Sequence, residues 1–587
     1  MAVRRERNAS EGGTDEPAHG PNIDPWACDL HPQCRTARRK ARLPPMLRTT
    51  DCLPLVLFAA AAIAQDAQPG REATAASSRR PNAESPQPQG EVRSTETKAV
   101  DARRDAGASE GREATAASSR RPNVVFVLAD DLGYRELGCF GQQKIATPNL
   151  DRLAADGMRL TRHYSGSPVC APSRCVLMTG KHPGHAAVRD NQEAKPEGQW
   201  PLPAEEPVLA AVLHDAGFAT GAFGKWGLGM FDSSGDPLAR GFDTFFGYNC
   251  QRHAHTYWPA FLYDGKKRIP LRNEPPVPGS GKLREGEDPA DPNSYARFVG
   301  SDYAPDRIAT AAVEFVRANA ARPFFLYYPS VLPHLALHVP AEDLTPYRGK
   351  FEEKPYTGGN GYTPHPTPRA AYAAMITRLD REVGQLVAAL DAKGLTGNTL
   401  FVFSSDNGAT HSPVGGTDVD FFASCGELRG RKGSLYEGGI RVPTIVRWRG
   451  VVKPGSESAR VSGFEDWLPT FAAACDAKAP AGIDGISLLP TLRGEEQEPR
   501  PFLYREFAGY GGWQAVWVGD HKLVRRQLQK PKQATTELYD LAADVAEATD
   551  LAAKAPDRVR SLQAILDREH SASPTFPLAA IDGTTGK

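Results

Sequence analysis

The chain has 587 residues, which is enough for a large catalytic domain and a smaller second domain. Its 70 basic and 70 acidic side chains give a formal net charge of zero. This balance argues against a protein that binds nucleic acid or a membrane surface through bulk charge. A charged substrate must therefore be bound by a local cluster of side chains.

The first 64 residues are not expected to belong to a folded domain. Residues 1–45 are polar, basic and rich in Pro and Arg, and we interpret them as an untranslated or disordered leader. Residues 46–64 have the basic start, the apolar run and the Ala-Ile-Ala ending of a secretory signal peptide. About 12 apolar residues are too few for a stable membrane anchor. We therefore expect translation from Met46, cleavage after Ala64, and export to the periplasm or the extracellular space. The alternative, a short buried helix, has no neighbouring periodic segment.

Residues 65–120 are predicted to be a disordered linker, because they contain almost no large apolar side chains. The segment GREATAASSRRPN occurs in them at 70–82 and again at 111–123. Only the second copy leads into a predicted strand. We interpret the repeat as a duplicated tether and not as a solenoid.

The catalytic domain is predicted over residues 121–450, and it begins with a buried strand. Asn123 to Leu128 is a continuous apolar run, as expected for a strand that is covered on both faces. The run is followed by Asp130 and Asp131. Two adjacent carboxylates at such a strand end repel each other unless a cation lies between them. Two solvated acids in a loop would have the same sequence.

The next stretch with chemical character is CAPSRCVLMTGK, residues 170–181. Pro172 suits the first turn of a helix, so Cys170 is expected beside a helix N-terminus, where free amide groups favour anions. Arg174 and Lys181 add two positive charges. A buried structural cysteine is the alternative, since free cysteines mostly lie in cores.

Helices and strands then alternate along the chain. The predicted order is a helix over 208–213, a strand over 218–223, a helix over 306–320, a strand over 324–328, a helix over 369–393 and a strand over 399–404. This order predicts an α/β fold with a large, mixed, mostly parallel sheet sandwiched by helices. The last strand ends in Asp406 and Asn407. With Asp130 and Asp131 they offer four oxygen donors, which favour Ca²⁺ or Mg²⁺ over zinc.

Residues 451–587 are predicted to form a smaller C-terminal α+β subdomain with an antiparallel sheet. Short strands are expected within 502–517 and 521–526, with a Gly-Asp turn at 519–520 and a closing helix over 557–570. Six cysteines follow the expected cleavage site. If Cys170 has a chemical role, the other five allow at most two disulfides.

The 170–181 stretch resembles the sulfatase signature, which is Cys-x-Pro-Ser-Arg followed by Thr-Gly-Arg/Lys. Over residues 121–570 the chain resembles formylglycine-dependent type I sulfatases of the alkaline-phosphatase-like superfamily. This resemblance implies that the chain has their fold. The resemblance implies that a formylglycine-generating enzyme oxidises Cys170. It further implies one divalent ion, usually Ca²⁺, surrounded by the modified Cys170 and by Asp130, Asp131, Asp406 and Asn407. A hydrated aldehyde has two hydroxyls, one to attack sulfur and one to expel sulfate.

Three further stretches match this family. GKWGLG contains Lys225, and RGRKGSLYEGGIRVP contains Lys432; the resemblance implies that both lysines bind sulfate oxygens, together with Arg174 and Lys181. YPSVLPHLALHVP contains His334, which the resemblance implies is the general acid for the leaving group.

One position departs from the family pattern, because Gly227 replaces the histidine of GKWHLG. That histidine contacts the formylglycine hydroxyl, so another residue must replace it. The candidates are His253 and His255 in GYNCQRHAHTYWP, and His182 and His185 in GKHPGH. We select His255, with His185 in reserve.

The remaining histidines and several aromatic residues are assigned to the substrate. We expect His185, His253 and His338 to line the substrate pocket. Tyr248, Tyr257 and Trp258 suit stacking on a sugar, although they could equally be core residues.

The sequence therefore predicts an exported sulfatase that acts on sulfated carbohydrates, at a chain end. A phosphomonoester or phosphonate hydrolase of the same superfamily and a non-catalytic sulfoglycan-binding protein are the alternatives. The expected partners are a sulfated small molecule or glycan and the formylglycine-generating enzyme. Neither nucleic acid nor a stable membrane anchor is expected.

Overall fold

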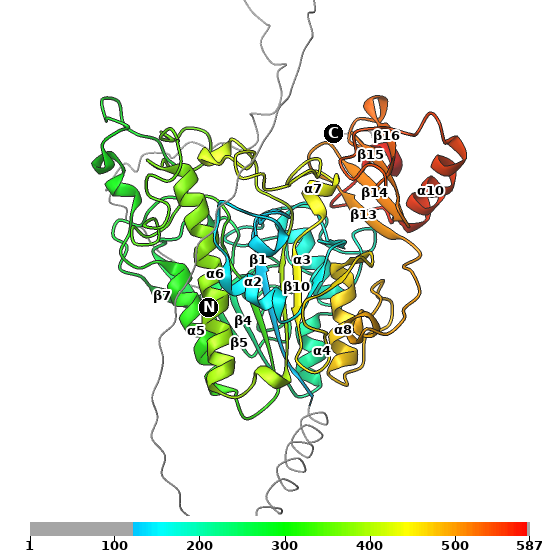
Figure 1. Cartoon of the computed structure of the whole chain (residues 1–587), viewed down its shortest axis with the longest axis horizontal. Helices are drawn as coiled ribbons and strands as arrows, with labels where there is room; N and C mark the ends of the chain where they lie inside the picture. Colours follow the sequence, from blue (N-terminus) through cyan, green and yellow to red (C-terminus); the bar gives the residue numbers. More distant parts are fainter. Residues whose placement is uncertain (1–120, 584–587) are drawn as a thin grey trace, which may run out of the picture. The chain divides into compact units, whose positions relative to one another are not determined.

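A ten-stranded sheet forms the centre of the computed structural model, which describes residues 121–583 (Figure 1). The predicted leader, signal peptide and linker lie outside the described residues. In spatial order the strands are β11 (Ser456–Ser458), β2 (Met158–Leu160), β10 (Thr444–Arg447), β9 (Thr399–Ser405), β1 (Asn123–Ala129), β8 (Phe324–Pro329), β4 (Ala219–Lys225), β5 (Thr244–Tyr248), β6 (Phe261–Asp264) and β7 (Lys267–Pro270).

The middle of this sheet is parallel and its flanks are mixed. The strands β9, β1, β8, β4 and β5 run in one direction, and in this register Ala129 of β1 lies beside Ser405 of β9. β10 is antiparallel to both β9 and β2, and β6 is antiparallel to β5. The predicted mixed, mostly parallel sheet is confirmed.

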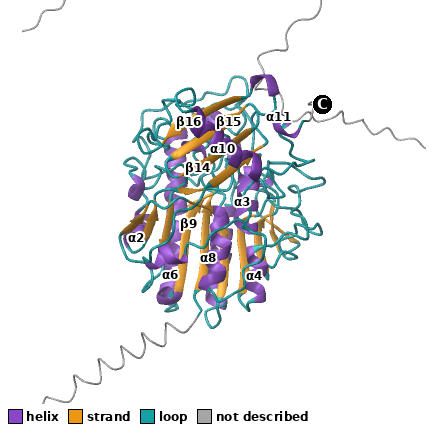
Figure 2. Cartoon of the chain, turned by 90° about the vertical axis from the view of Figure 1, so that its right-hand side faces the viewer, coloured by secondary structure: helices purple, strands orange, loops and turns teal. Residues whose placement is uncertain are grey.

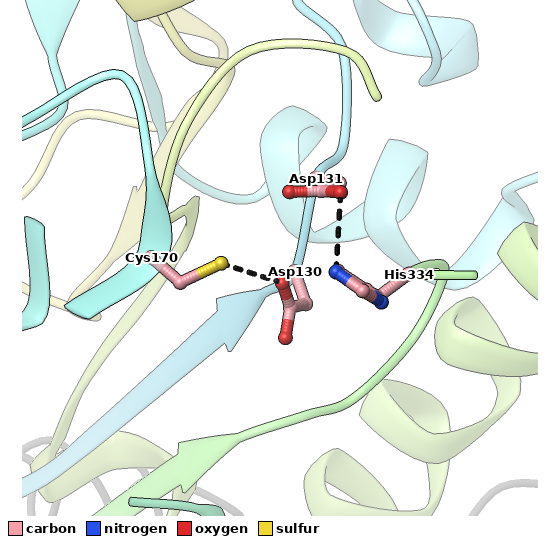
Figure 3. Close-up of side chains that lie close together, drawn as sticks. All are labelled: Asp130, Asp131, Cys170 and His334. Atoms are coloured by element: carbon pink, nitrogen blue, oxygen red, sulfur yellow. Dashed lines mark hydrogen bonds and ion pairs between the residues drawn. The ribbon is translucent and has the colours of Figure 1, made fainter. Parts of the chain in front are cut away.

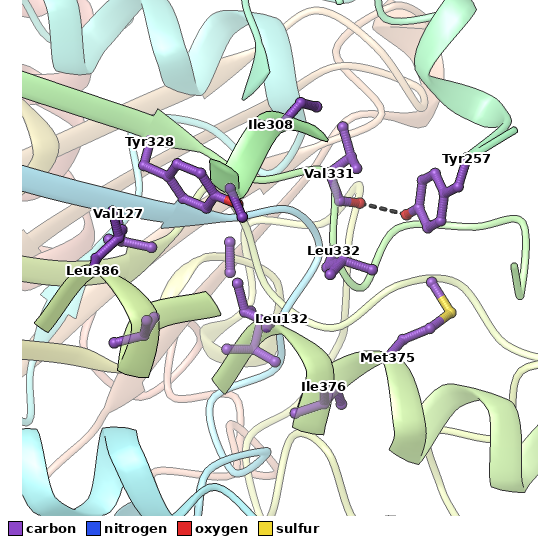
Figure 4. Close-up of a cluster of buried hydrophobic side chains, with 14 of the residues drawn as sticks. Val127, Leu132, Tyr257, Ile308, Tyr328, Val331, Leu332, Met375, Ile376 and Leu386 are labelled. Carbon is purple, nitrogen blue, oxygen red and sulfur yellow. Dashed lines mark hydrogen bonds between the residues drawn. The ribbon is translucent and has the colours of Figure 1, made fainter. Parts of the chain in front are cut away.

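Helices cover both faces of the sheet, because the side chains of β1 alternate between two core clusters. Val125 and Val127 pack into a cluster with α2, α5 and α6, part of which is drawn in Figure 4. Val124 and Phe126 pack on the opposite face with α3, α4 and α8. The helices are α2 (Pro148–Ala155), α3 (Cys170–Thr179), α4 (Leu209–Asp215), α5 (Ala304–Ala318), α6 (Pro368–Ala392), α7 (Glu437–Ile440), α8 (Trp467–Ala474), α9 (Leu489–Arg493), α10 (Pro556–Glu569) and α11 (Ala579–Asp582).

A separate antiparallel sheet lies beyond one end of the large-sheet strands (Figure 2). It consists of β13 (Leu503–Phe507), β14 (Trp513–Val518), β15 (His521–Arg526) and β16 (Thr535–Asp540). Leu562 and Leu566 of α10 pack against it, so the predicted α+β subdomain is confirmed. Two residues from each of the strands β3 (His163–Tyr164) and β12 (Ser462–Gly463) form a third, short sheet.

The expected domain boundary at residue 450 differs from the structure. β11 pairs with β2 of the large sheet, and α8 buries Trp467, Leu468 and Phe471 in the core on one face of that sheet. An apolar helix must bury its apolar face against a neighbour, and here the large sheet supplies it. The small sheet begins only at Leu503.

A buried ion pair holds β13 of the small sheet against the turn that precedes α8. Arg505 on β13 binds Glu465 through two hydrogen bonds of 3.0 and 2.9 Å, and its Nε donates to the carbonyl of Ser165. Burial raises the pKa of Glu465, but Arg505 and Arg500 outweigh this effect and hold that pKa at about 2. Bidentate pairing fixes the direction of β13 and of the loop that follows it.

Two expectations concern features that the described residues lack. No helix between residues 121 and 583 has both the length and the apolar character needed to cross a bilayer. The six cysteines in this part of the chain are all unpaired, so the structure contains neither of the two disulfides that their number allowed.

Candidate active site

An acidic cluster forms where two neighbouring parallel strands end. Asp130 and Asp131 follow β1, and Asp406 and Asn407 follow β9, so the register of these strands brings all four side chains together. The backbone amide of Asp131 donates to Asp406 Oδ1 at 3.1 Å, and Asn407 Nδ2 donates to Asp131 Oδ1 at 2.8 Å. All four side chains are buried.

Three cations balance the three carboxylates of this cluster. The nitrogen–oxygen distances are 2.5 Å for Lys225–Asp130, 2.8 Å for Arg174–Asp406 and 2.8 Å for Lys432–Asp131. Arg174 also lies 3.3 Å from Asp130 and is completely buried. Arg174 is therefore held by carboxylates, whereas Lys432 Nζ lies 3.7 Å from the sulfur of Cys170.

The cations decide which carboxylates ionise readily. Burial raises the pKa of Asp131, but Lys432 and His334 outweigh burial and place that pKa far below its usual range. Burial and the charge of Asp130 together raise the pKa of Asp406 to about 6. Adjacent buried carboxylates are costly unless further positive charge lies between them.

The donor set fits a hard divalent ion. Three carboxylates and one amide oxygen point into the cluster, and Asn407 Oδ1 is buried without a hydrogen-bond partner among the described residues. A buried carbonyl oxygen that accepts nothing is costly, and a cation would satisfy it. Because three positive and three negative side chains cancel, a divalent ion would leave an excess of two positive charges to attract an anion.

Cys170 begins α3 beside this cluster (Figure 3). Val169 before it is extended, and all ten residues of the helix are buried. Cys170 Sγ lies 3.5 Å from Asp130 Oδ1 and 3.7 Å from Lys432 Nζ. Burial raises the pKa of the thiol to about 12, although Lys225 and Lys432 oppose this effect. An unmodified thiol would therefore stay protonated, and would be a poor nucleophile.

His334 lies on the loop after β8 and faces the same cluster. Its Nε2 is 3.7 Å from Asp131 Oδ2 (Figure 3). Its Nδ1 is 2.6 Å from the carbonyl of Leu335. A carbonyl only accepts, so Nδ1 carries a proton and Nε2 faces the cluster. Burial and Lys432 lower the pKa of His334 to about 4.

His255 is brought to the same place by a short 3-10 helix, η2 (His253–His255). Its ring stacks on His334 at a centroid distance of 5.2 Å, and lies 5.6 Å from the ring of Tyr362. Burial lowers the pKa of His255 well below its usual value, and His334, Lys225 and Lys432 add to this effect. The structure thus places the selected replacement histidine beside the general-acid candidate.

The space left at Gly227 is taken by a residue that sequence reasoning missed. Gln251 Nε2 lies 2.9 Å from the position that a Cβ on Gly227 would occupy. This nitrogen is buried and has no hydrogen-bond partner among residues 121–583. Gln251 is part of the stretch GYNCQRHAH, but a single glutamine in a loop belongs to no sequence pattern that would predict its contacts.

Four predicted site residues do not join the cluster. Lys181 Nζ lies at the other end of α3 and pairs with Glu206 at 2.7 Å. His185 stacks on His182, and both rings lie near Asp484. The ring of His253 packs against Tyr248 and Phe261, and His338 is bound by Thr363 and the backbone of Tyr257.

The aromatic residues that were assigned to the substrate also lie away from the cluster. Tyr248, Tyr257 and Trp258 are buried in the core, so the alternative reading of these three aromatic residues is the correct one. His338 packs against Trp258 and is equally buried. Solvent-accessible stacking on a sugar is not possible for these residues.

Other residues at the cluster were not predicted. Thr410 Oγ1 donates to Asp131 Oδ2 at 3.0 Å. Burial lowers the pKa of His411 to about 4 and raises the pKa of Tyr362, while the charge of Lys432 lowers the pKa of both side chains. Tyr510 comes from the loop between β13 and β14. Thr410 and His411 follow Asn407 closely enough to be inferred from it, whereas Tyr510 is remote in sequence.

Models of known protein families match most of the described chain. A family model for sulfatases matches residues 122–477, and one for the C-terminal part of N-sulphoglucosamine sulphohydrolase matches 431–570. The chain is 31% identical over 427 residues to steryl-sulfatase of Mus musculus, covering 64% of this chain and 65% of that protein. It is 34% identical over 391 residues to arylsulfatase A of Homo sapiens, covering 65% and 69%. The matches thus span about two thirds of each relative.

The fold has close counterparts among solved structures. Ps i-CgsB in complex with k-i-k-neocarrahexaose superimposes with a TM-score of 0.62 and 25% sequence identity. The superposition covers 79% of this chain and 96% of that one.

Proposed function

Because this chain belongs to the sulfatase family of sulfuric ester hydrolases, we propose that it hydrolyses sulfate esters of carbohydrates. The proposed nucleophile is a hydroxyl of the hydrated formylglycine that is made from Cys170. The observation that carries the proposal is the charge-balanced cluster of three carboxylates and three cations around Cys170. A carbohydrate substrate is supported by the k-i-k-neocarrahexaose that is bound in the complex of Ps i-CgsB.

The acidic cluster would hold Ca²⁺ or Mg²⁺. When bound, such an ion polarises a sulfate oxygen and lowers the pKa of the attacking hydroxyl. The protein itself supplies Lys225 and Lys432, whose ammonium groups pair with Asp130 and Asp131 and lie in reach of a sulfate at Cys170. These fixed cations stabilise the negative charge that the sulfuryl oxygens keep during transfer.

Two histidines would handle the protons. His334 holds its Nδ1 proton on the carbonyl of Leu335, so its Nε2 is the atom that gives a proton to the departing sugar oxygen. Bound sulfate adds negative charge near this ring, which raises the low pKa that the empty cluster imposes. His255 stays neutral beside it and takes the proton from the second hydroxyl of the hydrate when sulfate is expelled.

The two histidines are predicted to respond differently to the leaving group. His255→Ala should lower turnover by roughly 10²–10⁴-fold with both sugar sulfates and aryl sulfates, since sulfate release needs its base in either case. His334→Ala should lower turnover of sugar sulfates by a similar factor but affect aryl sulfates less, because a phenolate needs little protonation. The measurement is kcat for both substrate types. Intact aryl sulfate turnover in His255→Ala, with only weaker sugar binding, would assign His255 to the substrate pocket.

The alternative functions differ in substrate charge or in catalysis. A phosphate monoester carries more negative charge than a sulfate ester, and a non-catalytic binding protein would turn over neither. We predict that the matured enzyme hydrolyses 4-nitrophenyl sulfate with a kcat/KM at least about 100-fold above that for 4-nitrophenyl phosphate, a difference of about 2.7 kcal/mol in transition-state binding. Equal or reversed values would favour the phosphoester hydrolase, and no turnover of either would favour the binding protein.

We further propose export to the periplasm or the extracellular space. The support is the signal-like composition of residues 46–64, followed by the linker at 65–120. Maturation would require a formylglycine-generating enzyme as a partner before folding, since Cys170 is buried in the folded protein.

A further inference from the structure

Tyr510 is an exposed aromatic residue beside the reaction centre. It lies between β13 and β14, and 49% of its surface is accessible. Val299 is the other large hydrophobic residue with comparable exposure among residues 121–583. The backbone of Tyr510 has a φ of 51°, which is rare for a non-glycine residue and suggests that the surroundings impose it.

The ring of Tyr510 lies over the backbone next to Lys432. A Cβ on Gly433 would be 3.0 Å from Tyr510 Cδ1, so the ring packs directly on that glycine. The ring also stacks on His411 at a centroid distance of 5.6 Å and an angle of 18°, and the Tyr510 hydroxyl is 3.1 Å from His411 Nε2. We call Tyr510 and His411 the aromatic shelf. The shelf contacts Gly433, the residue after Lys432, and Lys432 Nζ lies 3.7 Å from Cys170 Sγ.

A polar cavity is lined by Ala508, which precedes Tyr510 by two residues. It has a volume of about 270 Å³ and is lined by Asp190, Asn191, Gln192, Gln529 and Phe576, among others. Asn191 Oδ1 accepts a hydrogen bond of 3.0 Å from the amide of Ala171, the residue after the nucleophile.

Asp190 connects this cavity to the shelf. Its Oδ2 is 2.8 Å from the Cβ position of Gly509, the residue before Tyr510. Burial raises the pKa of the Tyr510 hydroxyl, and Asp131, Asp190 and Cys170 add to the effect while Lys432 opposes it. Gly509 therefore links the two features, because Asp190 of the cavity contacts it and Tyr510 of the shelf follows it in the chain.

The carboxylate of Asp190 gives the cavity a negative charge. The amide of Asn191 donates to its Oδ1 at 2.7 Å, and no cation pairs with it among the described residues. Burial raises the pKa of Asp190 to about 6, so the group is mostly ionised at neutral pH. An ionised carboxylate accepts hydrogen bonds from hydroxyl groups and repels other anions.

We propose that the aromatic shelf and the Asp190 cavity form one saccharide subsite, in which the sulfated sugar ring stacks on Tyr510 and an uncharged, hydroxyl-rich neighbouring sugar enters the cavity. Aromatic rings offer an apolar face to the C–H face of a sugar, and the adjacent acceptors bind its hydroxyls. The subsite deepens the proposed function, since it relies on sulfate being held at Cys170. It selects sulfated glycans whose second sugar is neutral, and disfavours a uronate or a second sulfate there.

Binding measured without turnover tests this subsite. The full chain with Cys170→Ala is titrated by calorimetry with galactose and N-acetylgalactosamine sulfated at positions 2, 3, 4 or 6 where available. Each sugar is used free, extended by galactose, or extended by glucuronate. We expect at least one galactose-extended probe to bind about tenfold or more tightly than its glucuronate counterpart. Adding Tyr510→Ala should raise its Kd by about tenfold, Tyr510→Phe should change it less than threefold, and Asp190→Asn should remove most of the discrimination against glucuronate.

Val299→Ala serves as the matched control, because it removes the other exposed apolar side chain and should leave every Kd unchanged. The proposal is overturned if no probe binds, if Tyr510→Ala binds like the parent, or if Asp190→Asn keeps the full preference for neutral extensions. Near-ultraviolet circular dichroism shows whether a variant has kept its fold. If the binding tests fail but the parent enzyme hydrolyses 4-nitrophenyl sulfate normally, the subsite alone is rejected. If the saccharides bind but the parent enzyme hydrolyses no sulfate ester, the proposed function alone is rejected.

Discussion

Replacing Cys170 by alanine is expected to lower turnover of every sulfate ester by roughly 10⁵-fold or more, the scale seen when a catalytic nucleophile is removed. The side chain is buried at the start of α3, between Asp130 and Lys432, where a sulfate ester would meet the cations. Burial raises the pKa of its thiol to about 12, which favours the protonated form and makes an unmodified side chain a poor nucleophile.

The peptide that contains Cys170 provides the direct measurement. Its mass in the active enzyme should be lower by the difference between a CH₂SH and a CHO group, and enzyme produced without a formylglycine-generating enzyme should keep the thiol. Cys175→Ala is the matched control, since Cys175 is a buried thiol on the same helix and should retain both the modification and the activity. A fully active preparation in which Cys170 is an unmodified thiol would refute the mechanism.

Removal of the divalent ion is expected to have the second-largest effect. Treatment with a chelator should lower turnover at least about 100-fold, because a bound ion stabilises the transition state by several kcal/mol, and Ca²⁺ or Mg²⁺ should restore it. The ion should also stabilise the fold, since Asp130, Asp131 and Asp406 repel one another and Asn407 Oδ1 lacks a partner among the described residues. At 100 times its Kd, the ion would add about 2.7 kcal/mol to the free energy of unfolding.

Thermal unfolding with and without Ca²⁺ separates the metal's two effects. Asn407→Ala should weaken both the rise in Tm and the restoration of activity. Asp484→Asn is the matched control, because Asp484 belongs to the separate cluster with His182 and His185. If active protein contains zinc alone, or if Asn407→Ala responds to Ca²⁺ like the parent, the oxygen-donor argument is wrong.

The strands and helices that position the candidate site could be predicted because their signals are local. The Val-rich run of β1 is buried on both faces, so its sequence lacks the alternation of apolar and polar residues that is typical of a surface strand. Pro172 and the apolar residues after it gave the start of α3 correctly. The acids after β1 and β9 meet because parallel strands carry their C-terminal ends to one edge.

Roles that depend on long-range contacts were predicted less well. Lys181 belongs to the signature stretch, yet the ten-residue helix carries it away from Cys170 to Glu206. His185 is similarly held by Asp484, which lies 299 residues further along the chain. A charged side chain pairs with an opposite charge that the fold brings close to it, and the sequence does not show which residue supplies that charge.

The α/β architecture, the acidic strand ends and the family signature around Cys170 could be read from the residues alone, because they depend on periodicity and on neighbours within a few residues. A second set of contacts became visible only in the folded chain: His255 stacks on His334, Gln251 fills the space beside Gly227, and Tyr510, in the loop between β13 and β14, stacks on His411. The second set depends on how loops from separate elements pack, which burial of their remaining surfaces decides once the sheets are joined.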